Sequence, residues 1–244
     1  MTAVASAPRT ALRLGLIAAV FWLGAHLQST GLLPAIFEHG EDVAYLIREH
    51  VRLVAISGAL AILVATPLGI LLTRPAFRPY TNFVTQFINL GTTIPTLAVL
   101  ALSMSFLGIG APPAVFGLFV LSLLPILLNT VAGIRSVPAH LIEAARGMGL
   151  TNRQILVQVE LPNAAFVILA GIRTALAINV GTAPLAFLIG GGGLGELIFT
   201  GIDLMDPSML LAGAIPTALL AIFVDFLVGQ AQFWLIPRGV NPLR

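Results

Sequence analysis

The side chains that could do chemistry are few in this 244-residue chain. It holds ten carboxylates, twelve arginines and four histidines, but no lysine and no cysteine. Without cysteine there are no disulfides, thiolate metal sites or cysteine nucleophiles. Without lysine there is no Walker-type phosphate loop, which requires Gly-Lys-Ser/Thr. We therefore expect no catalytic centre, metal or cofactor on this chain.

The histidines and a run of glycines could also indicate a catalytic site, but neither pattern supports one. None of the histidines lies deep in an apolar stretch, which disfavours a Ser–His hydrolase inside the membrane. The Gly190–Gly193 run could suggest a phosphate loop, but it follows an apolar helix rather than a strand and has no lysine. We interpret the run as a flexible outer turn in which Gly192 is a candidate gate residue.

The elements that position these residues must be membrane helices. Hydrophobic residues make up 58% of the chain and charged residues 9%, with a mean hydropathy of +1.01, whereas soluble domains carry about 25% charge. The scattered arginines and the net charge of +2 form no nucleic-acid-binding face, so lipid is the expected surrounding. A bilayer core needs roughly 20 apolar residues per helix. Six stretches qualify: Leu14–Leu33, Val51–Leu72, Phe87–Leu107, Ala114–Ile134, Ala164–Ile189 and Met209–Val228.

The composition therefore predicts an all-α, polytopic membrane protein with one transmembrane domain over residues 1–244. Most arginines fall on the cytoplasmic side and most acidic residues outside if both termini are cytoplasmic. The first stretch could instead be a cleaved signal peptide, but no small-x-small site follows it, so we favour a retained anchor. Apolar positions recur at helical spacing from Asp42 within residues 34–50, which predicts an amphipathic helix lying at the interface.

The longest inner segment, about residues 135–163, has the pattern of two short helices. Ser136 is the expected N-cap of the first, which stops at the Gly147–Gly149 hinge. Thr151 and Gln154 have capping-box spacing and open the second, which Leu161-Pro162 should end. Such an element at the membrane face is suited to being gripped by a partner.

The same segment resembles the signature loop of ABC-importer permeases. Glu143-Ala144-Ala145 is followed after three residues by Gly149, and nine residues later by Val159-Glu160-Leu161-Pro162. Flanking segments resemble the permeases of osmoprotectant importers for glycine betaine, choline and carnitine. They include residues 50–57, 66–70, 91–98, 124–133, 170–175, 179–182 and 189–195. The resemblance covers about residues 48–203, and Pro184 departs from its pattern, which leaves the local helix geometry open.

The resemblance implies a MetI-like permease in the bacterial cytoplasmic (inner) membrane. It implies a dimer with a second copy or a paralogue, a separate ATP-binding subunit and an extracytoplasmic substrate-binding protein. The coupling residues would be Glu143, Ala144, Ala145, Gly149, Leu161 and Pro162. Alanines leave a helix face flat enough for close docking, and Glu143 offers a charge to a partner.

A small solute released by a binding protein needs a polar route that binds it weakly. The candidates within the spans, besides Gly192, are Pro95 and the polar or ionisable residues Thr92, Thr93, Asn129, Arg173, Asn179 and Thr182. The uncharged ones could instead make interhelical hydrogen bonds. Arg173 could equally snorkel to headgroups or pair structurally, and we expect Asp225 to be an interfacial residue near the inner end of its span.

Two other transporter classes remain open. One is an ABC-importer permease for a different small solute, such as an amino acid. The other is an ion-coupled secondary transporter, which would require ionisable groups near the midplane and usually internal repeats. Neither feature is evident in the sequence.

Overall fold

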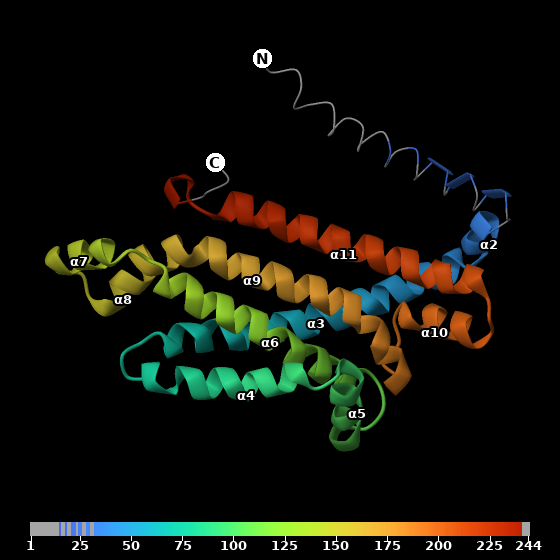
Figure 1. Ribbon diagram of the computed structural model, residues 1–244, viewed down its shortest axis with the longest axis horizontal. Coiled ribbons are helices and arrows are strands. Elements are labelled where there is room, and N and C mark those ends of the chain that lie inside the picture. The colour runs from blue at the N-terminus through green and yellow to red at the C-terminus, as the bar shows by residue number, and fades with distance from the viewer. Residues whose placement is uncertain are drawn as a thin grey trace, which may run out of the picture.

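The computed structural model describes residues 32–240 and, before them, only residues 15, 18, 21, 22, 24, 25, 28 and 29. The predicted span Leu14–Leu33 therefore lies largely outside the described residues. Every regular element from residue 32 to 240 is a helix (Figure 1). The principal ones are α2 (Leu32–Glu38), α3 (Gly40–Leu72), α4 (Thr81–Thr93), α5 (Thr96–Leu107), α6 (Ala111–Arg135), α7 (Ala139–Gly147), α8 (Asn152–Ile155), α9 (Leu161–Thr182), α10 (Gly195–Asp203) and α11 (Pro207–Leu235).

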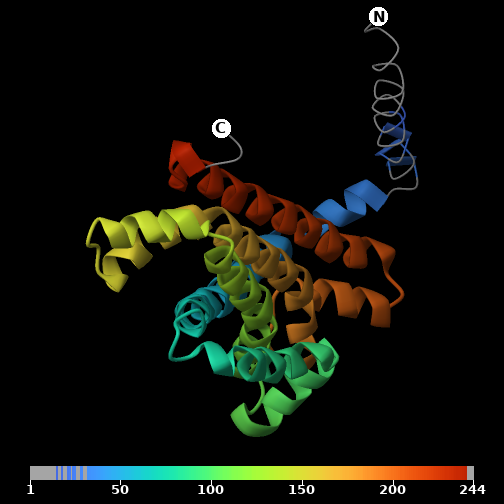
Figure 2. The ribbon, with the colours of Figure 1, turned by 60° about the vertical axis from the view of Figure 1, so that its left-hand side comes forward.

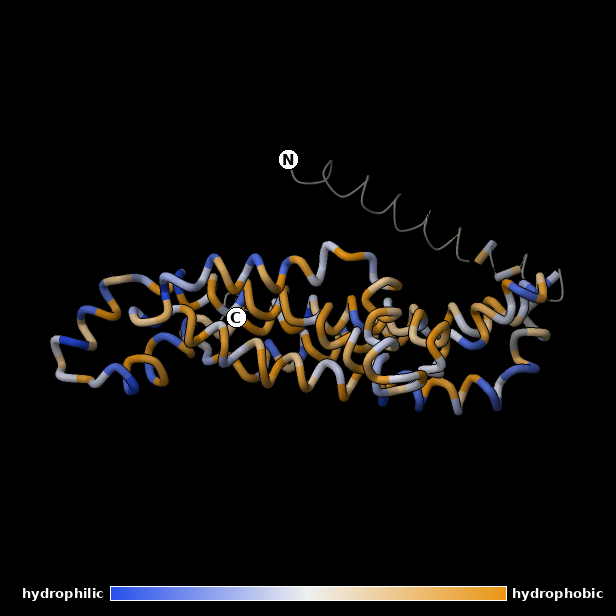
Figure 3. The backbone as a smooth tube through the Cα atoms, turned by 90° about the horizontal axis from the view of Figure 1, so that it is seen from below, coloured by the Kyte–Doolittle hydropathy of each residue, from blue (hydrophilic) through white to orange (hydrophobic). Residues whose placement is uncertain are grey.

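Four helical runs in the described part are long and apolar enough to cross a membrane, and a bent pair could form a fifth. The four are α3, α6, α11 and the continuous run Asn152–Ile189. Hydrophobic residues dominate the middle of the bundle and hydrophilic ones gather towards its two ends (Figure 3). The all-helical membrane architecture predicted from composition is confirmed.

The bent pair corrects the prediction of one straight span at Phe87–Leu107. The Arg78–Thr93 segment and α5 meet at an angle of 98°, with Ile94 and Pro95 between them (Figure 2). Ile94 adopts the extended conformation (φ −70°, ψ 133°), because a proline ring excludes the preceding residue from the α region. The break therefore follows directly from Pro95.

α3 also differs from the prediction of an interfacial helix followed by a separate span. It runs unbroken for 33 residues, or about 50 Å. Its first turns pack on protein, because Leu46 forms an apolar cluster with Leu194, Leu197 and Ala212. An amphipathic pattern does not distinguish a face packed on another helix from one packed on lipid, and here the partners are α10 and α11.

α6 is the centre of the bundle, packed against α3 on one side and α9 on the other. Glycines allow these close approaches. A Cβ at Gly69 would lie 2.7 Å from the Thr130 side chain, and one at Gly171 would lie 2.4 Å from that of Asn129. Small residues commonly bring membrane helices together in this way.

The end of the molecule opposite α7 and α8 is closed by α10 and the start of α11 (Figure 1). Asp206 caps α11, because its Oδ1 accepts hydrogen bonds from the Ser208 and Met209 N–H groups at 2.9 and 3.2 Å. The Ser208 hydroxyl donates to the same oxygen, and these bonds hold the pKa of Asp206 below its usual range.

Candidate functional site

The predicted coupling loop forms a projecting pair of short helices, α7 and α8, at one end of the molecule (Figures 1 and 2). The turn from α3 to α4 and the end of α11 lie at this same end. Glu143 and Ala144 are exposed on α7, whereas Ala145 is buried at 1% exposure and fixes the helix to the body. α7 thus presents the Glu143 carboxylate and the Ala144 methyl group outward, beside the exposed Ala139, His140 and Arg146.

Gly149 ends α7 in the left-handed conformation, with φ +80°. Its N–H donates to the Arg146 carbonyl at 2.9 Å, and the Leu150 N–H donates to the Ala145 carbonyl at 3.1 Å. These two bonds form a Schellman motif, which requires a left-handed residue at the first position beyond the helix. The hinge predicted at the glycines is therefore a fixed reversal of the chain.

The predicted capping of the two loop helices is half right. The capping box at Thr151 is confirmed, since the Gln154 side chain accepts from the Thr151 N–H at 2.8 Å and the Thr151 hydroxyl accepts from the Gln154 N–H. Ser136 is not an N-cap: it follows α6, and its hydroxyl donates to the Gly133 carbonyl at 2.8 Å. The Ser136 hydroxyl bonds to a carbonyl in the last turn of α6 instead of capping α7.

Leu161 and Pro162 do not end the second loop helix, contrary to the sequence prediction. The chain continues from α8 through a single π-helical stretch, Leu156–Glu160, directly into α9. The wider π turn accommodates a proline that cannot donate to the preceding turn. α8 is therefore continuous with a membrane-spanning helix.

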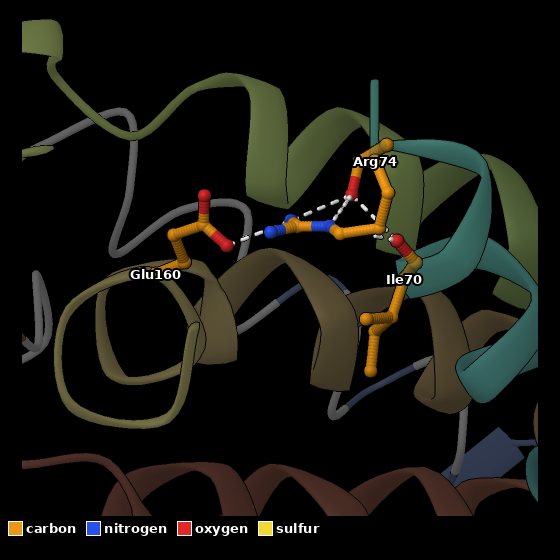
Figure 4. Close-up of polar contacts among 4 residues, drawn as sticks. Ile70, Arg74 and Glu160 are labelled. Carbon is orange, nitrogen blue, oxygen red and sulfur yellow. Dashed lines mark hydrogen bonds and ion pairs between the residues drawn. The ribbon is translucent and has the colours of Figure 1, made fainter. Parts of the chain in front are cut away.

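An ion pair that the sequence did not reveal links the loop to the turn that follows α3. Arg74 Nη2 lies 2.7 Å from Glu160 Oε2 (Figure 4), and Glu160 is 8% exposed. The Arg74 Nε group also donates to the Ile70 carbonyl at 3.3 Å, which holds the guanidinium in place. The partners are 86 positions apart, so no helical spacing links them.

Three of the predicted pathway residues line one pocket. Thr92, Asn129 and Thr182 face a hollow of about 490 Å³ where the α4–α5 break meets α6 and α9. Thr96, which the sequence reasoning missed, lines it too. The hydroxyls and the amide donate to carbonyls of their own helices, as Thr182 does to Ile178 at 2.9 Å. The pocket has polar atoms but no charged side chain, as a weakly binding route requires.

The other pathway candidates lie elsewhere. Thr93 and Pro95 are exposed at the α4–α5 break, and neither lines the pocket. Asn179 is buried and donates to Ser57 at 2.9 Å and to Ser122 at 3.1 Å, so it joins α9 to α3 and α6. Gly192 has φ +75° and lies in the turn before α10, away from the pocket.

Arg173 is paired with Asp225 on α11 through two hydrogen bonds, the Nε–Oδ1 contact measuring 2.5 Å. Both side chains are about 40% exposed. α11 extends ten residues beyond Asp225 to Leu235, so this helix is longer than the predicted span Met209–Val228. Of the alternatives left open for Arg173, the structure favours pairing.

The relation to known proteins agrees with this geometry. The model of the family of binding-protein-dependent transport-system inner-membrane components matches residues 65–238. The chain belongs to this family. It is therefore a membrane transport component of the ABC type and not an enzyme, which confirms the class predicted from the Glu-Ala-Ala loop.

Curated relatives place the chain among permeases named for osmoprotectants. It is 57% identical over 199 residues to the osmoprotectant import permease protein OsmY of Salmonella typhimurium, which covers 82% of this chain and 84% of that one. It is 43% identical to the carnitine transport permease protein OpuCB of Listeria monocytogenes, with coverage of 85% and 94%. A choline transport system permease, OpuBB of Bacillus subtilis, is 42% identical, with coverage of 84% and 94%.

A solved structure confirms the fold. A chain of the inward-facing MetNI methionine ABC transporter superposes with a TM-score of 0.72 at 23% identity, covering 80% of this chain and 96% of that one. The MetI-like permease fold predicted from the sequence is thereby shown.

Proposed function

We propose that the protein is the permease through which an ATP-driven importer carries a small quaternary amine of the glycine betaine, choline and carnitine class. The observation that carries the substrate class is the 57% identity over most of the chain to an osmoprotectant import permease. The uncharged pocket, lined by four polar and five apolar residues, supports it, because a zwitterion or monocation would meet hydroxyl and amide oxygens there without a carboxylate to trap it.

The pathway would form where a second copy or a paralogue faces the α4–α5 break. Thr92, Thr96, Asn129 and Thr182 would contribute its polar wall. Gly192, at the opposite end from α7, would belong to the outer mouth, where an external binding protein releases solute. The chain would act as a single transmembrane domain, with both termini in the cytoplasm.

ATP and Mg²⁺ would be bound by a separate subunit that docks on α7. Glu143 and Ala144 are the exposed groups that such a subunit would contact. Gly149 would fix the angle of α7, while the continuity of α8 with α9 through Leu161 and Pro162 would carry its movement into the membrane. The Arg74–Glu160 pair would make α3 move with it.

The test is ATPase stimulation in the purified complex. The chain should copurify with an ATP-binding subunit, and its external binding protein should stimulate hydrolysis when loaded with betaine, choline or carnitine. Stimulation by none of the three would overturn the substrate class and leave the permease assignment standing. A binding protein that stimulates only with an amino acid would favour the other solute class.

A further inference from the structure

A pocket of about 750 Å³ beneath the coupling helices has no role in the transport path described above. It lies between the α3–α4 turn, the end of α6 and helices α7 and α8. Its charged lining consists of one carboxylate and four guanidinium groups, Glu160 against Arg74, Arg78, Arg135 and Arg146.

The positive charge in this pocket is largely unbalanced. Glu160 pairs with Arg74 at 2.7 Å. Among the described residues, Arg78, Arg135 and Arg146 have no carboxylate within ion-pair distance. Arg135 has a neutral partner, the Thr81 hydroxyl, at 3.3 Å. Three exposed arginines that line one hollow without a counter-charge favour a multivalent oxygen anion, and planar guanidinium groups match phosphate oxygens well.

Apart from Thr73 and Asn152, the rest of the lining is apolar, which favours an amphiphile over a soluble ion. Ile134, Val137, Ile142 and Ile155 line the same pocket. The adjoining turn carries two exposed aromatic residues, Phe77 at 42% and Tyr80 at 60% exposure. This turn directly follows Leu72, where the apolar α3 ends, and aromatic residues in such a position mark the headgroup level of a bilayer.

We propose that this pocket binds the phosphodiester headgroup of an anionic phospholipid, such as phosphatidylglycerol. The headgroup would contact Arg78, Arg135 and Arg146, and the glycerol and first acyl carbons would lie against the isoleucines. The proposal depends on the proposed function for one point alone, that this end of the bundle lies at the cytoplasmic leaflet. Because Arg146 belongs to α7 and Arg78 to the α3–α4 turn, the lipid would also brace the coupling helix against the bundle.

The test measures binding of fluorescent phosphatidylglycerol to the full chain, copurified with its ATPase in neutral detergent, with phosphatidylcholine as the comparison. We expect tighter binding of phosphatidylglycerol. Each Arg→Gln change at 78, 135 or 146 should weaken it by about fivefold, and the triple variant R78Q/R135Q/R146Q by well over tenfold. The single variants keep the test decisive should the triple variant fail to fold. The matched control R48Q/R52Q/R153Q loses the same charge outside the pocket and should bind as the wild type does.

Several results would overturn the lipid site. They are equal binding of the two lipids, an equal loss in the control variant, or displacement of the lipid by excess inorganic phosphate, which would mark a soluble anion. Selective binding that appears only without the ATPase would also refute it, because the subunit would then be the occupant. If the binding protein still stimulates ATP hydrolysis but the chain does not prefer phosphatidylglycerol, the lipid site alone is refuted. If the chain prefers phosphatidylglycerol but no ATPase copurifies with it, the proposed function alone is refuted.

Discussion

Replacing Gly149 by alanine tests whether the fixed shape of the coupling loop matters for transport. With φ +80°, Gly149 occupies a conformation that L-residues avoid, and nothing lies within 4 Å of the Cβ that alanine would add. Any effect must therefore come from the backbone. A left-handed conformation costs an L-residue roughly 1–2 kcal/mol.

That cost can be converted into an expected loss of coupling. Roughly 1–2 kcal/mol would lower the population of the Schellman-closed loop about five- to thirtyfold relative to competing conformations. If α7 must be held at its native angle to be driven by the ATPase, solute taken up per ATP should fall in the same direction, while membrane insertion stays normal. The assay is solute uptake and ATP hydrolysis measured together in proteoliposomes. Gly149→Asn should be intermediate, because asparagine tolerates this conformation better.

Gly147→Ala is the matched control. Its Cβ would also meet nothing within 4 Å, but Gly147 lies in the helical conformation at the end of α7. Alanine is favoured over glycine in helices, so coupling should be unchanged or slightly improved. Wild-type coupling in Gly149→Ala, or equal losses in the two variants, would refute the reasoning.

Four further predictions concern other parts of the molecule. Glu143→Arg should leave the chain inserted and the complex assembled but reduce uptake per ATP; unchanged uptake would count against a coupling role. Arg173→Leu and Asp225→Leu should each lower the melting temperature in detergent more than the double substitution does, with a coupling energy of about 1 kcal/mol, and strictly additive effects would contradict their pairing. Asn179→Ala should destabilise the chain by roughly 1–3 kcal/mol in thermal unfolding, since two buried hydrogen bonds are lost, and an unaltered transition would sink this role. Asn129→Leu should slow solute uptake while copurification with the ATPase persists, and full uptake would remove it from the pathway.

Local signals in the sequence predicted the parts of the fold that depend on neighbouring residues. The Thr151 and Gln154 spacing gave the capping box correctly, and Gly149 gave the reversal after α7. The same local view failed at Ser136, where the carbonyls of the preceding helix compete for the hydroxyl. It also failed at Pro162, where a π turn accommodates the ring within a continuous helix.

The site depends on contacts between segments that are distant in the sequence, and sequence reasoning could not predict those contacts. Arg74 lies in the turn after α3 and Glu160 in the π stretch before α9, while Arg173 and Asp225 lie on α9 and α11. Residues that line the pocket and residues that bond helices together are the same polar types, so sequence alone could not separate Asn129 from Asn179. Only the packing of α6 against α3 and α9 decides which of the two is buried.

The central claim is that this chain conducts a quaternary amine by using ATP hydrolysed on a partner. The most direct measurement is uptake of labelled glycine betaine, choline or carnitine into proteoliposomes that contain the permease and its ATPase, with ATP inside and the binding protein outside. The account predicts uptake of at least one of the three that requires both ATP and the binding protein. Uptake driven by a proton or sodium gradient without ATP would contradict it.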